Sequence, residues 1–216
     1  MMHAYDKLYL DKARTALARM LDFAVYDLHY DISEFFELFL ASGIARRFEQ
    51  GDFTILAGLA GMSGVELAYT VLENVGLAQE RIKPDYPVNR SEEYWTGWAL
   101  AYYQWQTALS FAEINRYVPI KTVQSLYNPY HEMDIRHFTE KMTELYKEAK
   151  KDTNLKLLRV KAELTQRELA ELAEVPLRTV QQYEQRQKNI NRAQAETLAR
   201  IAKQLYCNIE DLLEKV

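Results

Sequence analysis

The sequence predicts an all-α protein in which a larger helical domain precedes a smaller one. Glycine (7) and proline (5) are scarce among the 216 residues, and strong helix formers dominate the composition. Apolar residues recur at helical three-four spacing almost throughout. Charge divides the chain: residues 150–216 carry 13 Lys/Arg against 10 Asp/Glu, a balance of +3, and residues 1–149 carry 14 against 21, a balance of −7. Such asymmetry indicates two parts with different partners.

Apolar stripes and capping residues place the first helices of the larger domain. One helix is expected over 10–28, where apolar residues follow three-four spacing. A second should begin at the N-cap Asp31 and end near Gly51. A third follows the capping-box pair Ser63 and Glu66.

An aromatic helix follows a loop expected at residues 76–90. It is predicted over 91–117 and ends before Pro119, where a short helix begins. Asn128-Pro129 is expected to break the helical structure before a last helix near 132–150. One face of the aromatic helix carries Trp95, Trp98, Tyr102, Trp105, Leu109 and Ala112.

The stretch from Tyr94 to Ala112 has no charged side chain and is nearly as long as the roughly 20 residues of a membrane helix. It contains Thr96, Gln104 and Gln106, which are costly in hydrocarbon, so a buried core helix is the better interpretation. No secretory signal is visible at the start of the sequence. We therefore expect a cytoplasmic protein with no membrane partner.

The histidine and cysteine patterns of the sequence predict no catalytic, metal or cofactor site. His131 and His137 are six residues apart and fall on opposite faces of a helix, unlike a zinc motif. Cys207 is the single cysteine, which excludes an internal disulfide, and core packing suits it. No nucleophile–base pair emerges, so an enzyme is not expected. The aromatic stripe packs in the core by default, and a ligand cavity or a partner interface remains open.

Two short helices joined by a tight turn carry the chemistry of the smaller domain, which we place at 151–216. Thr165 and Glu168 form a capping box at the first helix. The second helix runs over 177–184 and turns Val180 and Tyr183 inward. Its outward row is Arg178, Gln181, Gln182 and Gln185. This is a DNA-reading arrangement.

The stretches TQRELAELAEVPLRTVQQYEQRQKNI and QAETLARIAKQLYCNIEDLL resemble the XRE, or lambda-repressor-like, helix-turn-helix family over about residues 154–216. The resemblance implies a five-helix domain that binds double-stranded DNA. Contacts with base edges would come from Leu177, Arg178, Gln181 and Gln182. Contacts with the DNA backbone would come from Thr165, Gln166, Thr179 and Lys188. Arginine can bond guanine, and glutamine adenine, in a bidentate way.

Two positions depart from the family pattern. Glu174 stands where the turn often has glycine, so a left-handed conformation there is either absent or strained. Pro176 stands where a polar residue usually caps the recognition helix, and it cannot cap with its side chain. Both leave the start of that helix open.

The sequence thus predicts a sequence-specific transcriptional regulator. Residues 1–150 resemble helical modules of antitoxin-like bacterial regulators through ISEFFELFLASGIARRFEQG, MSGVELAYTVL and WTGWALAYYQWQTALSF. That resemblance implies an autoregulating antitoxin whose acidic domain binds a cognate toxin protein. The alternative is a ligand-responsive repressor with an aromatic effector pocket; an enzyme with a DNA-binding tail lacks a catalytic constellation. A homodimer is expected, because one recognition helix reads too few base pairs.

Overall fold

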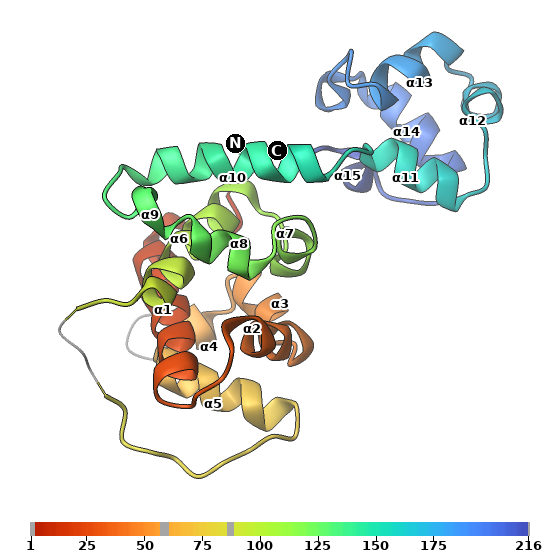
Figure 1. Ribbon diagram of the computed structural model, residues 1–216. Coiled ribbons are helices and arrows are strands. Elements are labelled where there is room, and N and C mark those ends of the chain that lie inside the picture. Colours follow the sequence, from red (N-terminus) through yellow and green to blue (C-terminus); the bar gives the residue numbers. More distant parts are fainter. Residues whose placement is uncertain (1–2, 57–60, 86–88, 216) are drawn as a thin grey trace. The chain divides into compact units, whose positions relative to one another are not determined.

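The computed structural model describes residues 3–56, 61–85 and 89–215, and every regular element in these ranges is a helix. The chain divides into two compact units, Met1–Ala149 and Lys150–Val216, here called unit 1 and unit 2 (Figure 1). The all-α class predicted from the sequence is confirmed. No helix in the described ranges combines the length and the apolar character needed to cross a membrane.

Unit 1 contains one short 3-10 helix and ten α-helices among its described residues. They are η1 (Lys7–Tyr9), α1 (Leu10–Tyr26), α2 (Ile32–Ala41), α3 (Ile44–Glu49), α4 (Phe53–Leu56), α5 (Gly64–Asn74), α6 (Glu92–Thr107), α7 (Phe111–Tyr117), α8 (Ile120–Ser125), α9 (Tyr127–Tyr130) and α10 (Ile135–Ala149). The loop expected at 76–90 is free of helix over 77–85 and 89–90, and residues 86–88 lie outside the described ranges.

Helix α1 is the centre of unit 1 and packs against α5 and α6. Two glycines allow the close approach. A Cβ on Gly97 of α6 would lie 2.6 Å from the carbonyl oxygen of Leu17 and 2.7 Å from Cα of Ala18. A Cβ on Gly64 of α5 would lie 2.6 Å from the backbone nitrogen of Met20. Both helices therefore meet α1 backbone to backbone.

Phenylalanine rings form a second part of the core, between α2, α3 and α7. Phe39 lies 5.4 Å from Phe111 and 6.4 Å from Phe48, measured between ring centroids in edge-to-face geometry. All three rings are fully buried. Edge-to-face pairs add to the stabilisation that burial alone provides.

Two of the expected helices are each broken into a pair. The helix predicted to run from Asp31 to Gly51 is interrupted at Gly43, whose φ of 77° separates α2 from α3. The helix predicted over 91–117 is interrupted at Ala108, which has φ 52° at the end of α6. Ser110 then caps α7 by accepting a hydrogen bond from the backbone of Glu113. Each break lets the chain turn back and pack on the same core.

The aromatic stripe of α6 is divided between core and surface. Trp95 and Trp105 are 9% and 5% exposed, whereas Trp98 and Tyr102 are half-buried. The indole nitrogen of Trp105 donates to the carbonyl of Tyr5 at 2.8 Å, which satisfies its polar atom. Core packing thus accounts for part of the stripe only.

Unit 2 is built from five α-helices and a 3-10 turn in its described part. They are α11 (Asn154–Lys161), α12 (Gln166–Leu172), α13 (Leu177–Glu184), η3 (Ile190–Arg192), α14 (Ala195–Gln204) and α15 (Ile209–Leu212). Each α-helix contributes to one apolar core, for example through Leu155, Leu169, Val180, Ile201 and Leu212. Cys207 packs against this core and is half-buried.

Candidate nucleic-acid interface

The turn between α12 and α13 sets the start of the second helix. Glu174 adopts the left-handed conformation, with φ 51°, so the alternative in which that conformation is absent does not hold. Its carboxylate accepts from the guanidinium of Arg200 at 3.0 Å. Pro176 occupies the N-cap position without a side-chain hydrogen bond, and α13 begins at Leu177.

Helix α12 begins with the capping box that the sequence predicts. The hydroxyl of Thr165 accepts from the backbone nitrogen of Glu168 at 3.2 Å, and the Glu168 carboxylate accepts from the backbone nitrogen of Thr165 at 2.7 Å. These bonds to the backbone and hydroxyl of Thr165 hold the pKa of Glu168 below its ordinary value. The Thr165 side chain is exposed, with its oxygen committed to the cap.

Helix α13 has a buried face and a solvent-facing face. Val180 is fully buried and Tyr183 is 8% exposed, which confirms that both point inward. The opposite face carries side chains at positions i, i+3, i+4 and i+7, which lie in one row on a helix. That row consists of Arg178, Gln181, Gln182 and Gln185.

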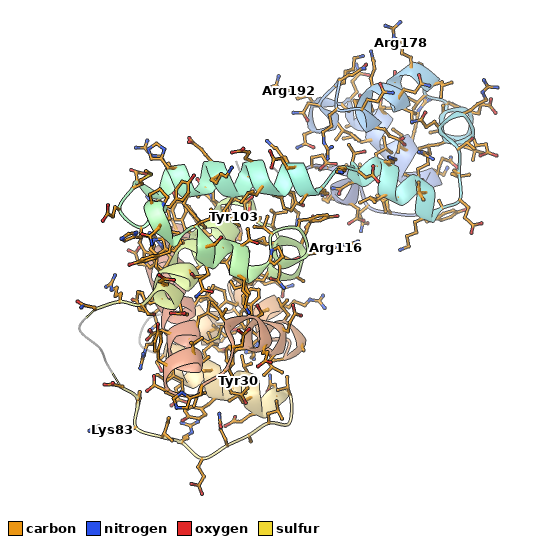
Figure 2. The ribbon with its side chains drawn as sticks, viewed as in Figure 1. Tyr30, Lys83, Tyr103, Arg116, Arg178 and Arg192 are labelled. Carbon is orange, nitrogen blue, oxygen red and sulfur yellow. The ribbon has the colours of Figure 1, made fainter. Side chains whose placement is uncertain are left out.

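Arg178 is the most accessible of the predicted base readers. It is exposed near the start of α13 and extends away from the core of unit 2 (Figure 2). Across the described residues, no hydrogen bond or ion pair is seen for the side chains of Arg178, Gln181 or Gln182. Their donors and acceptors are therefore not committed to the fold.

Leu177 and Thr179 are less accessible than Arg178. Leu177 is half-buried and packs against the apolar core of unit 2. Thr179 is also half-buried and lies in the first turn of α13. Gln181 and Gln182 are half-buried as well. The structure therefore brings the four predicted base readers to one helix, and of these four only Arg178 is exposed.

A buried carboxylate that sequence reasoning missed connects three helices. Glu184, at the end of α13, accepts two hydrogen bonds from Arg159 of α11, at 2.6 and 2.9 Å. It also accepts one from the side-chain nitrogen of Gln166 of α12, at 2.7 Å. Glu184 raises the pKa of the Arg159 guanidinium through these bonds. Gln166 is thus held at the start of α12 with one amide donor used internally.

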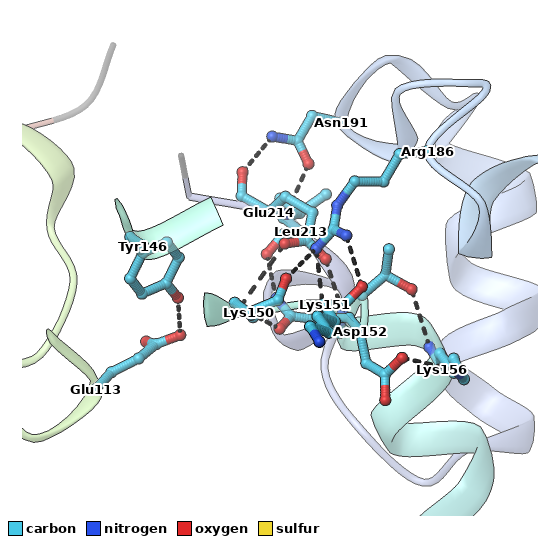
Figure 3. A network of polar contacts seen from close by, with 12 residues as sticks. Glu113, Tyr146, Lys150, Lys151, Asp152, Lys156, Arg186, Asn191, Leu213 and Glu214 are labelled. Carbon is cyan, nitrogen blue, oxygen red and sulfur yellow. Dashed lines mark hydrogen bonds and ion pairs between the residues drawn. The ribbon is translucent and has the colours of Figure 1, made fainter. Parts of the chain in front are cut away.

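The segment after α13 is anchored to the first residues of unit 2 (Figure 3). Arg186, with φ 55°, donates to the backbone carbonyls of Lys150 and Lys151 at 3.0 and 2.8 Å. Asn191 in η3 exchanges side-chain hydrogen bonds with the backbone of Glu214. These bonds hold the cationic loop that follows α13 against residues near the two ends of unit 2.

Two exposed cations in that loop extend the candidate surface. The family resemblance predicts that Lys188 contacts the DNA backbone, and it makes no such prediction for Arg192. Arg192 extends outward from unit 2 (Figure 2). A simple feature of the sequence could have identified Arg192: together with Lys188 it flanks the polar turn that follows α13.

The described residues contain no group of three or more His, Cys, Asp or Glu side chains that could hold a metal ion. His131 lies against Tyr127, with its Nδ1 2.9 Å from the carbonyl oxygen of that residue. His137 is exposed and lies near Glu140.

Residues 155–212 match the helix-turn-helix family, a range that begins in α11 and ends with the last residue of α15. No curated protein and no solved structure matches the chain. With α12, the turn and the outward row of α13, this match indicates a DNA-binding transcription regulator. The domain that makes it one is a helix-turn-helix of the XRE type, as the sequence resemblance predicted.

Proposed function

We propose that this regulator recognises a specific operator through the outward row of α13. The observation that carries the proposal is the set of uncommitted polar groups on Arg178, Gln181 and Gln182, all on one helix face. Base edges in the major groove present acceptors to arginine and donor–acceptor pairs to glutamine. Leu177, half-buried at the start of the helix, would contribute an apolar contact with its exposed part.

Backbone phosphates would be bound around this row. Gln166 retains one amide donor beyond its bond to Glu184, and the start of α12 presents free backbone N–H groups. Thr165, Thr179 and Lys188 complete the proposed set. Such contacts position the protein on DNA and carry no base preference.

Mobility shift with DNA from upstream of the protein's own gene tests the base-reading role. The variant carries Arg178→Ala and Gln182→Ala together. Loss of two good base contacts should weaken operator binding by at least about thirtyfold, at roughly 1 kcal/mol or more each. Lys203→Ala, which removes one exposed cation from α14, is the matched control and should bind nearly as well as the wild type. Equal binding by the double variant and the control would refute the assignment.

Recognition by a homodimer is the second part of the proposal. One recognition helix reads only a few base pairs, and two half-sites about one helical turn apart supply the rest. Insertion of about five base pairs between the half-sites would place them on opposite sides of the duplex. Binding should then fall to the level of a single half-site. Unchanged affinity would argue for a monomer.

Unit 1 would connect this operator to a protein partner, in the manner of an autoregulating antitoxin. Its net charge of −7 repels DNA and suits a basic protein. Co-expression with each adjacent gene tests the idea. The expected result is a stable complex with one product and rescue of growth that the product alone arrests. Absence of a complex with either product would remove the antitoxin role and leave operator binding unaffected.

A further inference from the structure

A cavity of about 280 Å³ lies within unit 1, beside the first turns of α6. Its walls come from α6, from α9 and from the segment that leads into α10. The lining residues are Arg90, Ser91, Tyr94, Trp95, Trp98, Tyr127, Tyr130, His131, Met133 and Ile135. Six of these ten side chains carry an aromatic ring, counting the imidazole, so ring faces and edges dominate the surface.

The aromatic walls are held in place by contacts with one another and with Phe138, which is not part of the lining. Trp95 meets Tyr127 edge to face at 5.6 Å and Phe138 at 5.2 Å. Tyr127 stacks on His131 with centroids 4.0 Å apart and an interplanar angle of 11°. A cavity whose walls are already ordered requires little rearrangement on binding, which favours affinity.

The charge of the lining differs from that of the unit around it. Unit 1 is strongly acidic, yet the described residues of the lining include Arg90 and no Asp or Glu. Two carboxylates contact the lining from outside it. Asp22, which is paired with Arg19, accepts from the Ser91 hydroxyl at 2.6 Å. The exposed Glu132 lies 3.7 Å from Nε2 of His131. The Arg90 guanidinium lies 4.8 Å from the ring centroid of Tyr94. A second guanidinium, from Arg14, lies 3.3 Å from the ring centroid of Trp98.

Aromatic cages often bind cations through the faces of their rings. Here two of the rings already have guanidinium partners, on Tyr94 and Trp98, and the described part of the lining offers no carboxylate of its own to balance a further positive charge. A cationic ligand would be repelled, and an anionic group would be attracted to Arg90.

We infer that this cavity is a binding site for a small planar aromatic anion, such as a one- or two-ring carboxylate. Its volume is near the lower end of ligand pockets, which span about 300–1,000 Å³. The ring system stacks among Tyr94, Trp98 and Tyr130, and the anionic group faces Arg90. Met133, which is 47% exposed, adds an adaptable apolar side chain at the edge. The inference gives the ligand-responsive alternative a location and does not depend on operator binding.

Isothermal titration calorimetry on the full chain tests the site with three ligands of one shape: 2-naphthoate, its neutral amide 2-naphthamide, and the cation 2-naphthylmethylammonium. We expect naphthoate to bind most tightly, the amide about fivefold more weakly, and the cation more weakly still. Fivefold is the discrimination that one partly exposed ion pair supplies. Equal binding of all three, tightest binding of the cation, or no heat with any of them would overturn the inference.

Two variants and a matched control assign the binding to this cavity. Arg90→Gln should abolish the preference for naphthoate over the amide. Tyr94→Leu should weaken both ligands about equally, because it removes a ring wall. Arg116→Gln is the control: Arg116 (labelled in Figure 2) is also exposed and lies 5.5 Å from a tyrosine centroid, that of Tyr117, but it does not line the cavity. Circular dichroism checks that each variant is folded. Identical preferences in Arg90→Gln and Arg116→Gln would refute the role of Arg90.

Discussion

The buried ion pair between Arg159 and Glu184 predicts a large loss of stability when its carboxylate is removed. The two side chains are 11% and 2% exposed. Glu184→Ala would leave the guanidinium with one remaining bond, to the backbone carbonyl of Leu164 at 2.7 Å. Breaking a buried pair by removing one partner costs about 3–5 kcal/mol. The remaining bond and the small exposure of Arg159 place the expected loss at the lower end, about 3 kcal/mol.

That loss is large relative to the stability of unit 2. A domain of this size is stable by only about 3–10 kcal/mol, and 1 kcal/mol moves the melting temperature of a 60–100-residue domain by about 4–8 °C. The melting temperature of unit 2 should therefore fall by about 12 °C or more. The three tryptophans, Trp95, Trp98 and Trp105, all belong to unit 1, so their fluorescence follows that unit alone. Far-ultraviolet circular dichroism follows the unfolding of both units. The transition that moves to lower temperature should be the one that has no accompanying change in tryptophan fluorescence.

Glu171→Ala is the matched control, because Glu171 is an exposed glutamate of α12 in the same unit. It should change stability by no more than about 0.5 kcal/mol. If Glu184→Ala melts with Glu171→Ala, the buried pair contributes nothing and the reasoning is refuted. If the tryptophan fluorescence transition shifts instead, the destabilisation lies in unit 1, and this would also contradict the prediction.

Three further predictions follow from other contacts. Gly97→Ala should destabilise unit 1 by about 1–2 kcal/mol in urea unfolding followed by tryptophan fluorescence, because the new Cβ meets the α1 backbone at 2.6 Å; a more stable variant would contradict this close packing. Arg186→Gln should destabilise unit 2 by about 1–2 kcal/mol through loss of its bonds to the carbonyls of residues 150–152, seen as a lower melting temperature by circular dichroism, and an unchanged melt would refute the anchor. The folded-state pKa of Glu168 lies below its ordinary 4.5, so its contribution is present above that pH and is lost as the pH falls through the lower value. As the pH falls from above 4.5 through that lower pKa, unit 2 should lose more stability in the wild type than in Glu168→Gln, and parallel pH profiles would argue against the cap.

Local signals in the sequence identify most helix starts. Asp31, Ser63, Ser91 and Thr165 were each placed at the beginning of a helix, and each accepts hydrogen bonds from backbone amides there. A capping residue acts within three positions of itself, so the sequence nearby contains all the information needed. The capping box at Ser63 is only half formed, because Glu66 pairs with Arg81 instead.

Helix breaks were harder to predict, since they depend on distant packing. Gly43 offered a signal that was missed, because glycine adopts positive φ without strain. Ala108 offered none: alanine is the best helix former, and its φ of 52° is maintained by how α6 and α7 pack in unit 1. Tertiary structure overrides local preference at that residue.

The same distinction applies to the candidate interface. Val180 and Tyr183 point inward as helical periodicity predicts, and the outward row follows from the same pattern. Periodicity says nothing about Glu184, whose partners Arg159 and Gln166 are 25 and 18 residues away in the sequence. A glutamate at the end of a polar helix is ordinarily solvated. Its burial depends on contacts among three helices, which the local sequence does not reveal.

Glu174 shows how a departure from a family pattern can be accommodated. A left-handed residue other than glycine costs about 1–2 kcal/mol. The turn keeps that conformation in spite of the cost, because the chain must reverse its direction between α12 and α13. It must also lead into Pro176, whose fixed φ suits the residue before a helix. The pair with Arg200 offsets part of the strain, although both side chains are partly exposed and the gain is small. The geometry of the turn is therefore set by the packing of its two helices, and the residues within it adapt.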